Sequence, residues 1–433
     1  MIKITKIIIF SLCLISCSVY DTTGFWSKQK QIDKENLQFK KIFDEKEFQE
    51  IELNPSFSIN VEFENVKKNL DINFNNNDGY VNFNGEINNV SKFKFSKIKN
   101  FKKIEPNLIL NNNNVIFFDD KGNLLCFDQN SNLVWKQNIY TKEEIKIGPL
   151  LSLHKKNDKL IVTDNLARIY SLDIDTGDLI WEKRHNSPFN SEIKTYKNRI
   201  YVIDSKNTLN SFLLKDGSKV WSHITEKSFI NSLKRLSLVI INDKVIFNNS
   251  LGDITAVNAK DGKLIWQTVT FNSNMFEDIM SLKTSDLVID ENNLYFSNNK
   301  NEFYSVDSET GLINWKQQIS SNLKPTIIES LIFTFSNTGY QYVVEKNSGN
   351  IIRVNDVFYQ FKEKKRKKIS PIGFIMNTKE IFLSTSIGKL LIVNWSDGRV
   401  KNTINIGKDY ISRPYVDNKT MYLIKDNSII KLN

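Results

Sequence analysis

Short runs of apolar and aromatic residues, separated by polar turns, recur along most of this chain. In one copy, residues 159–163 (Lys-Leu-Ile-Val-Thr), 168–173 (Arg-Ile-Tyr-Ser-Leu-Asp) and 179–182 (Leu-Ile-Trp-Glu) predict three successive strands. Runs of four to six residues rich in Val, Ile, Tyr and Trp, bounded by Asn, Asp and Gly, are typical of strands and hairpins. A further strand is expected to lead each unit, as at residues 147–152 and 370–375. The pattern predicts four short antiparallel strands per unit.

A turn phrase marks each unit and sets its period. Asp175-Thr-Gly-Asp-Leu-Ile-Trp181 and Lys260-Asp-Gly-Lys-Leu-Ile-Trp266 are two copies of it. Glycine in this phrase supplies the positive φ that a tight hairpin needs. The turn positions recur roughly every 40 to 50 residues, a period typical of β-propellers and solenoids; they are Ser131, Gly177, Gly217, Gly262, Gly311, Gly349 and Gly398. Without helical periodicity between units, the repeat predicts propeller blades.

A tryptophan four residues after most turn positions has a structural interpretation. Neighbouring blades must bury one sheet face against the next, and a large flat side chain at a repeated place fills that wedge. We therefore expect packing rather than ligand binding for Trp135, Trp181, Trp221, Trp266 and Trp315.

The blade count depends on the two ends of the repeat region. Seven turn phrases are followed by three C-terminal strands, at residues 411–415, 421–424 and 428–432. The missing fourth strand has a candidate in Ser91-Lys-Phe-Lys-Phe-Ser96, which alternates as a half-buried strand does. Pairing the two ends in one blade removes the free edges of an open array. The prediction is an all-β fold, an eight-bladed propeller of four-stranded antiparallel blades over residues 91–433.

The N-terminus predicts export and a lipid anchor. Lys3 and Lys6 precede the apolar residues 7–16, a stretch too short to span a membrane as a stable helix. Leu14-Ile-Ser-Cys17 resembles the bacterial lipobox, which implies a signal peptide over residues 1–16, acylation of Cys17, and, with Ser18 next to it, an outer-membrane lipoprotein facing the periplasm. An ordinary signal peptide or an uncleaved anchor is the alternative. Residues 17–90 contain highly charged and Asn-rich stretches and predict a flexible tether.

The charge of the chain limits its partners. The formal net charge is +10, and for an exported protein this favours anionic lipid headgroups or acidic proteins over nucleic acid. The basic run at residues 362–368 (Lys-Glu-Lys-Lys-Arg-Lys-Lys) lies between two blades and predicts an exposed loop, either merely solvated or in contact with phospholipid or a partner.

No motif in the sequence indicates catalysis. The three histidines, His154, His185 and His223, are not spaced with Cys, Asp or Glu as metal ligands would be. The sequence has no Gly-rich phosphate loop, nucleophile elbow or zinc-protease motif. With Cys13 in the signal peptide and Cys17 acylated, Cys126 would be left without a disulfide partner. We therefore expect a protein that is not an enzyme and has no cofactor.

The phrase Ser171-Leu-Asp-x-x-Thr-Gly-x-x-x-Trp181 resembles the PQQ-like propeller repeat, over about three quarters of the chain. The quinoprotein dehydrogenase branch is generally longer and often has a pair of adjacent cysteines over its quinone site, which this chain lacks. The lipobox, the tether and the blade count resemble the BamB family of outer-membrane assembly lipoproteins. This resemblance implies a non-catalytic scaffold that binds BamA, the barrel-forming insertase subunit, beside other assembly lipoproteins, as a monomer within the complex.

The same resemblance implies that the partner contacts connectors between blades. The corresponding connectors are residues 228–235 and 276–286, and neither matches the family segment residue for residue. Apolar residues mixed with basic ones mark the first connector as a candidate interface; they are Phe229, Ile230, Leu233, Lys234 and Arg235. Packing of Ile230 and Leu233 between the blades is the alternative. For the whole protein, the alternatives are a periplasmic PQQ-dependent oxidoreductase and a ligand-binding or cell-wall-binding propeller.

Overall fold

The structure is a computed structural model that describes residues 50–61, 78–85, 87, 90–94, 106–226, 232, 234–270, 280–417, 419–425 and 427–433. The chain divides into two units, Met1–Glu50 and Ile51–Asn433.

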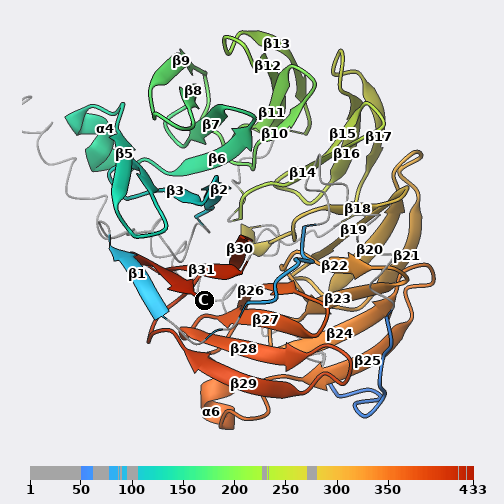
Figure 1. Ribbon diagram of the computed structural model, residues 1–433. Helices are drawn as coiled ribbons and strands as arrows, with labels where there is room; N and C mark the ends of the chain where they lie inside the picture. Colours follow the sequence, from blue (N-terminus) through green and yellow to red (C-terminus); the bar gives the residue numbers. More distant parts are fainter. Residues whose placement is uncertain are drawn as a thin grey trace, which may run out of the picture. The chain divides into compact units, whose positions relative to one another are not determined.

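The described strands form eight four-stranded sheets arranged as the blades of a ring (Figure 1). The predicted eight-bladed propeller is confirmed, with every strand pair antiparallel within its blade. Numbered along the chain, blade 1 consists of β2 (Ile109–Asn111), β3 (Asn114–Phe118), β4 (Leu124–Phe127) and β5 (Leu133–Gln137), and blade 2 of β6 (Leu151–Lys156), β7 (Lys159–Asp164), β8 (Arg168–Asp173) and β9 (Leu179–Arg184). Blade 3 consists of β10 (Lys194–Tyr196), β11 (Arg199–Ile203), β12 (Thr208–Leu213) and β13 (Lys219–Ile224), and blade 4 of β14 (Leu238–Ile241), β15 (Lys244–Asn248), β16 (Ile254–Asn258) and β17 (Leu264–Thr268).

Blades 5 to 8 repeat this plan, and the last blade joins the two ends of the repeat region. Blade 5 consists of β18 (Val288–Asp290), β19 (Asn293–Asn298), β20 (Glu302–Asp307) and β21 (Ile313–Gln317), and blade 6 of β22 (Thr326–Ile328), β23 (Leu331–Phe335), β24 (Tyr340–Glu345) and β25 (Ile351–Asp356). Blade 7 consists of β26 (Pro371–Met376), β27 (Glu380–Thr385), β28 (Lys389–Asn394) and β29 (Val400–Asn405), and blade 8 of β30 (Tyr415–Asp417), β31 (Thr420–Lys425), β32 (Ser428–Leu432) and β1 (Val90–Lys94).

The predicted closure of the ring is confirmed. Blade 8 has the order β1-β32-β31-β30, so the N-terminal strand is its outermost member. Val90 pairs with Leu432 and Lys94 with Ser428. The strand begins one residue earlier than predicted, and residues 95 and 96 lie outside the described residues. Phe93 is buried and its ring lies 5.8 Å from that of Phe127 in blade 1, which ties the last blade to the first.

The outer hairpin of each blade explains the repeated turn phrase. Gly177, Gly311 and the other turn glycines have φ near +70° to +77°, and Ser131, which stands at the turn position of blade 1, has φ +69°. In blades 1 to 7 a β-bulge interrupts the pairing of the third and fourth strands directly after the residue opposite the tryptophan position. A small residue stands opposite each of the five predicted tryptophans; these are Cys126, Ser171, Ser211, Ala256 and Ser305.

The predicted role of the tryptophans is confirmed. Each indole lies against the turn glycine of the next blade, as Trp266 does against Gly311. Each indole N–H also donates to a backbone carbonyl three residues before that glycine; the acceptors are the carbonyls of Ile174, Leu214, Ala259, Ser308 and Lys346. Burial of the ring and a bond that satisfies its only donor hold neighbouring blades together.

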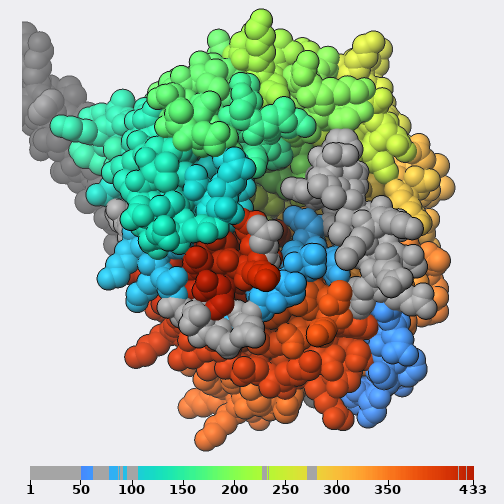
Figure 2. Space-filling view, viewed as in Figure 1, coloured from blue at the N-terminus to red at the C-terminus, as the bar shows by residue number. Residues whose placement is uncertain are grey.

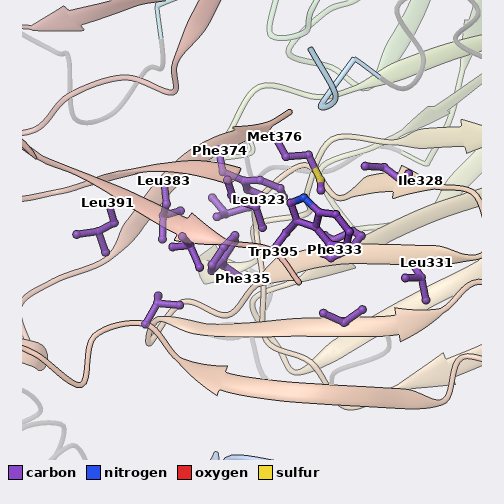
Figure 3. Packing of buried hydrophobic residues seen from close by; sticks show 14 of the residues in the cluster. Leu323, Ile328, Leu331, Phe333, Phe335, Phe374, Met376, Leu383, Leu391 and Trp395 are labelled. Carbon is purple, nitrogen blue, oxygen red and sulfur yellow. The ribbon is translucent and has the colours of Figure 1, made fainter. Parts of the chain in front are cut away.

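The apolar core divides into eight clusters, one at each junction between neighbouring blades. Figure 3 shows the junction of blades 6 and 7, where Phe333 and Trp395 meet edge to face with ring centroids 6.3 Å apart. Phe335 and Phe374 meet in the same way at 5.0 Å. The core is therefore a closed series of wedges between sheets.

Three local predictions are wrong. Residues 411–414 do not form the expected inner strand of blade 8, because that strand, β30, begins only at Tyr415. Residues 147–150 do not begin a strand, because Ile147 is the last residue of α4 (Lys142–Ile147) and Gly148, with φ +88°, ends that helix. Thr141 and Glu144 form a reciprocal capping box at its start, which stabilises this short helix. The basic run is exposed as expected, but it contains a one-turn helix, α6 (Glu363–Arg366), where a loop was expected.

Two parts of the predicted tether are packed on the propeller. In the N-terminal strap (residues 51–61), Leu53 pairs with Val354 on the outer strand of blade 6, and Ile59 is buried in the blade 6–7 core. In the inner segment (residues 78–85), Tyr80 pairs in parallel with Met376 of β26, the innermost strand of blade 7 (Figure 1). The expectation of an unpacked tether therefore does not hold for these two segments.

Candidate functional site

The starts of the inner strands bring charged side chains from several blades together. The ammonium of Lys234, before the inner strand of blade 4, lies 2.7 Å from a carboxylate oxygen of Asp286 in blade 5. The same ammonium donates to the carbonyl of Asn322, before the inner strand of blade 6, at 3.0 Å. Arg235 donates to the carbonyl of Leu151 in blade 2. The bonds to Asn322 and Leu151 join blade 4 to blades 6 and 2, which are not its neighbours, so these contacts span the inner side of the ring.

A polar chain continues this set toward blade 3. One carboxylate oxygen of Glu192 accepts hydrogen bonds from the Ser237 hydroxyl at 2.6 Å and from the backbone N–H of Leu238 at 3.0 Å. The other lies 3.9 Å from the ammonium of the buried Lys194. Ser237 also accepts from the backbone N–H of Leu287 at 3.0 Å, so blades 3, 4 and 5 are linked at this level.

The inner segment adds a carboxylate from the N-terminal part of the chain. Asp78 lies 2.5 Å from the ammonium of Lys324 in blade 6 and 3.4 Å from the guanidinium of Arg413 in blade 8. Gly79 fits against Thr326, because a Cβ at this glycine would lie 1.9 Å from the threonine hydroxyl. Figure 2 shows light-blue atoms from this region of the chain in the middle of the face, between blade 8 in red and blades 6 and 7 in orange. We call Asp78, Glu192, Lys194, Lys234, Asp286, Lys324 and Arg413 the inner charge cluster.

The electrostatics of the inner charge cluster favour the ionised form of its two aspartates. Burial raises the pKa of Asp78, but the charges of Lys324 and Arg413 outweigh it and hold that pKa well below its usual 3.8. Asp286 follows the same pattern, with Lys234 and Lys324 lowering its pKa against burial. Burial lowers the pKa of Lys194, and Glu192 opposes that shift. A carboxylate with a lowered folded-state pKa contributes stability above its unfolded pKa and loses it only as pH falls through the folded value.

The charges of the inner charge cluster lie close to one another in pairs and can hold its segments in place. Each of its four cations lies near a carboxylate of the cluster, with Lys194 at the longest distance, 3.9 Å. Across the residues that the structure describes, no group of three or more His, Cys, Asp or Glu side chains is placed to hold a metal ion. His154, near the cluster, bonds to the Thr195 hydroxyl at 2.9 Å, and burial together with Lys194 lowers its pKa to about 3, so its imidazole is neutral at pH 7.

The structure places two of the five predicted interface residues. Lys234 and Arg235 are half-buried and bond to Asp286, Asn322 and Leu151 as described above. Phe229, Ile230 and Leu233 lie outside the described residues, as does the predicted lipidation site Cys17. The first connector therefore stays a prediction as a partner interface.

Sequence reasoning missed the inner charge cluster, although a signal for part of it exists. Asp286, Lys324 and Arg413 each stand two residues before the inner strand of their blade. A charged residue at the same offset in three blades indicates side chains that meet at one level of the ring. Asp78 carries no such signal, because it precedes the repeats.

The described helices include none that is long and apolar enough to cross a membrane.

Comparison with known proteins places the chain in a family. The model of the family described as outer membrane protein assembly factor BamB matches residues 120–355, from the turn between β3 and β4 of blade 1 to the outer strand of blade 6. The chain belongs to the BamB family. A search of curated proteins gave no match.

Solved structures show the fold of this BamB-family chain in other proteins. The crystal structure of BamB from Moraxella catarrhalis is similar with a TM-score of 0.64 and 14% identity, covering 79% of this chain and 100% of that one. Quinohemoprotein alcohol dehydrogenase from Comamonas testosteroni has a TM-score of 0.64 and 8% identity over 86% of this chain and 82% of its own. The computationally designed Ika8 protein is similar with a TM-score of 0.61 and 10% identity, covering 78% of this chain and 99% of that one. At these identities the likeness concerns the fold alone.

Proposed function

We propose that this protein is a non-catalytic periplasmic scaffold of the machinery that assembles β-barrel proteins in the outer membrane. The family match over residues 120–355 carries the proposal. The paired charges of the inner charge cluster agree with it, because they leave no acid, base or nucleophile in an arrangement typical of catalysis. The partner is the barrel-forming insertase subunit, bound together with other lipoproteins of the complex.

We further propose that Cys17 carries the acyl chains and that residues 18–50 connect it to the propeller. The lipobox-like Leu14-Ile-Ser-Cys17 supports the anchor, and the positive charge of the chain suits an anionic membrane surface or an acidic partner. This arrangement puts the ring on the periplasmic side of the outer membrane and leaves its connectors free for protein contacts.

The partner contact is proposed at the connector that contains Phe229, Ile230, Leu233, Lys234 and Arg235. The apolar residues would supply a buried hot spot and the basic residues an electrostatic rim. Because Lys234 and Arg235 hold bonds inside the propeller, partner binding through them would exchange these bonds for others.

Affinity purification tests the proposed function. The full-length tagged chain, extracted from native membranes in mild detergent, is expected to recover a large β-barrel protein. The double change Leu233→Ala and Arg235→Glu should weaken this recovery at least about 30-fold, as loss of a hot spot does. A matched pair at the outer rim of blade 4, Leu264→Ala and Lys260→Glu, should leave it unchanged, since both side chains are exposed.

Two further measurements interpret the result. Melting temperatures distinguish lost contact from lost folding, because a packing role for Leu233 lowers the melting temperature while binding persists. Cys17→Ala should leave recovery in detergent intact and reduce the amount that sediments with membranes. Repeated absence of any β-barrel protein from the wild-type eluate would overturn the scaffold.

A further inference from the structure

The basic run between blades 6 and 7 projects from the surface of the propeller. Residues 362–368 contain six basic side chains and one acidic one, Glu363. Its five lysines are exposed, at positions 362, 364, 365, 367 and 368. Tyr359, three residues earlier, is 61% exposed. An exposed tyrosine beside several lysines combines an amphipathic ring with positive charge, a composition suited to the headgroup region of a membrane.

Internal contacts fix the position of this run. The guanidinium of Arg366 lies 2.5 Å from a carboxylate oxygen of Asp356, at the end of the outer strand of blade 6. Lys367 lies 3.4 Å from Glu363, and the Lys365 ammonium lies over the ring of Phe361 at 5.5 Å from its centroid. The pair of Arg366 and Asp356 anchors the run to blade 6, and the other two contacts hold the run itself in shape, at one corner of the ring at the lower edge of Figure 1.

The N-terminal strap reaches the same corner. The backbone N–H of Asp356 donates to the Glu52 carboxylate at 3.0 Å, so a single residue contacts both the strap and Arg366. The strap exposes apolar side chains here, with Ile51 at 73%, Leu53 at 42% and Phe57 at 53%. The acidic residues at this corner include Glu52, Glu363 and Asp356. The guanidinium of Arg366 pairs with the carboxylate of Asp356.

We propose that this corner, the basic run with Tyr359 and the start of the strap, binds the surface of a bilayer that contains anionic phospholipid. The proposal rests on the lipid anchor of the proposed function, because the chain enters the propeller here after leaving Cys17. Each lysine near an anionic surface strengthens binding by roughly fivefold, and the exposed apolar side chains can enter the headgroup layer. The tether that the sequence predicts between Cys17 and the propeller would give an effective concentration on the order of millimolar, at which a weak contact is occupied.

Vesicle binding by the purified full-length chain tests this surface. Sedimentation with phosphatidylglycerol–phosphatidylcholine vesicles is compared with sedimentation with phosphatidylcholine alone, to which the acyl chains bind equally well. Binding to the anionic vesicles is expected to exceed binding to the neutral ones and to fall with added salt. Lys362→Gln, Lys364→Gln and Lys368→Gln together spare the Lys365 and Lys367 contacts and should reduce the anionic preference on the order of 100-fold.

Two matched variants complete the design. Lys155→Gln, Lys215→Gln and Lys260→Gln remove three exposed lysines from blades 2, 3 and 4 and should retain the preference, as should arginine at positions 362, 364 and 368. Equal binding to both vesicles by the wild type, or equal losses in the two glutamine variants, overturns the proposal. Recovery of the β-barrel partner from the same variants separates the two hypotheses, since a failed lipid contact leaves that recovery intact.

Discussion

At the scale of single residues, contacts between an indole and a glycine join one blade to the next. Trp266 lies on Gly311 and donates its N–H to the carbonyl of Ser308. The glycine is required for two separate reasons: its φ of +76°, which side chains rarely tolerate, and the space that the indole occupies. A Cβ at Gly311 would lie 2.6 Å from the ring of Trp266.

Alanine at two glycines separates these two costs. Gly148→Ala meets only the conformational cost, because φ is +88° and nothing lies within 4 Å of the added Cβ. It should lower the free energy of unfolding by about 1 to 2 kcal/mol. Gly311→Ala should cost a further 1 to 3 kcal/mol or so, since the indole must shift. Urea unfolding measures both, and equal losses would show that the indole adapts without strain.

At the scale of elements, the N-terminal strap completes the junction of blades 6 and 7, where arginine stands at the position that tryptophan holds in blades 1 to 5. Arg353 stands at the tryptophan position of blade 6 and donates to the carbonyls of Trp395, Ser396 and Phe57. Trp395 lies three residues before Gly398, so Arg353 uses the acceptor that an indole uses elsewhere. Burial lowers the pKa of Arg353 to about 10, which leaves it charged at pH 7. The strap thus fills a wedge that the repeat leaves incomplete.

Substitution of Arg353 should release the strap. Arg353→Leu fills part of the same space with an apolar side chain but removes three bonds to carbonyls, and we expect a loss of about 2 to 4 kcal/mol in unfolding free energy. Hydrogen exchange at Leu53 and Ile59, whose backbone N–H groups bond to Val354 and Ser396, should accelerate. Arg399→Leu, in an exposed turn, serves as the control. Unchanged exchange in the strap would mean that Leu53 and Ile59 suffice to hold it.

At the scale of the molecule, one strand closes the ring. Blade 8 takes β1 from before the repeats and β32 from the end of the chain, and Phe93 carries the junction to blade 1. Every other junction is formed by blades that follow one another in sequence. Closure therefore depends on the pairing of residues from opposite ends of the propeller.

Loss of the Phe93 ring should weaken this junction specifically. Phe93→Ala is expected to reduce the unfolding free energy by about 3 to 5 kcal/mol and to speed hydrogen exchange in β1 and β32. Phe212→Ala, at the junction of blades 2 and 3, should cost a similar amount without this local effect. Equal rates of hydrogen exchange in β1 of the two variants would show that the ring opens at another junction.

The sequence predicted features that depend on local patterns and missed those that depend on distant ones. The turn at Ser131 and the closing strand could be predicted because spacing and alternation mark them. The helix at Lys142–Ile147 was missed although Thr141 and Glu144 carry its capping signal. The sequence shows that Arg353 stands where other blades have a tryptophan. It does not show which carbonyls Arg353 bonds to, because these belong to another blade and to the strap. The inner charge cluster brings together residues from Asp78 to Arg413, and the repeat marks only Asp286, Lys324 and Arg413 among them.

The pairing of β1 with β32 has a consequence for the timing of folding. A chain is synthesised from its N-terminus, so Val90 can pair with Leu432 only after all the intervening blades have been made. Contacts between residues so distant in sequence form slowly, and until they form an edge strand stays open to other chains. We expect completion of the ring to be the last and slowest step of maturation, and the interval before it to be the period in which the protein is most prone to aggregate.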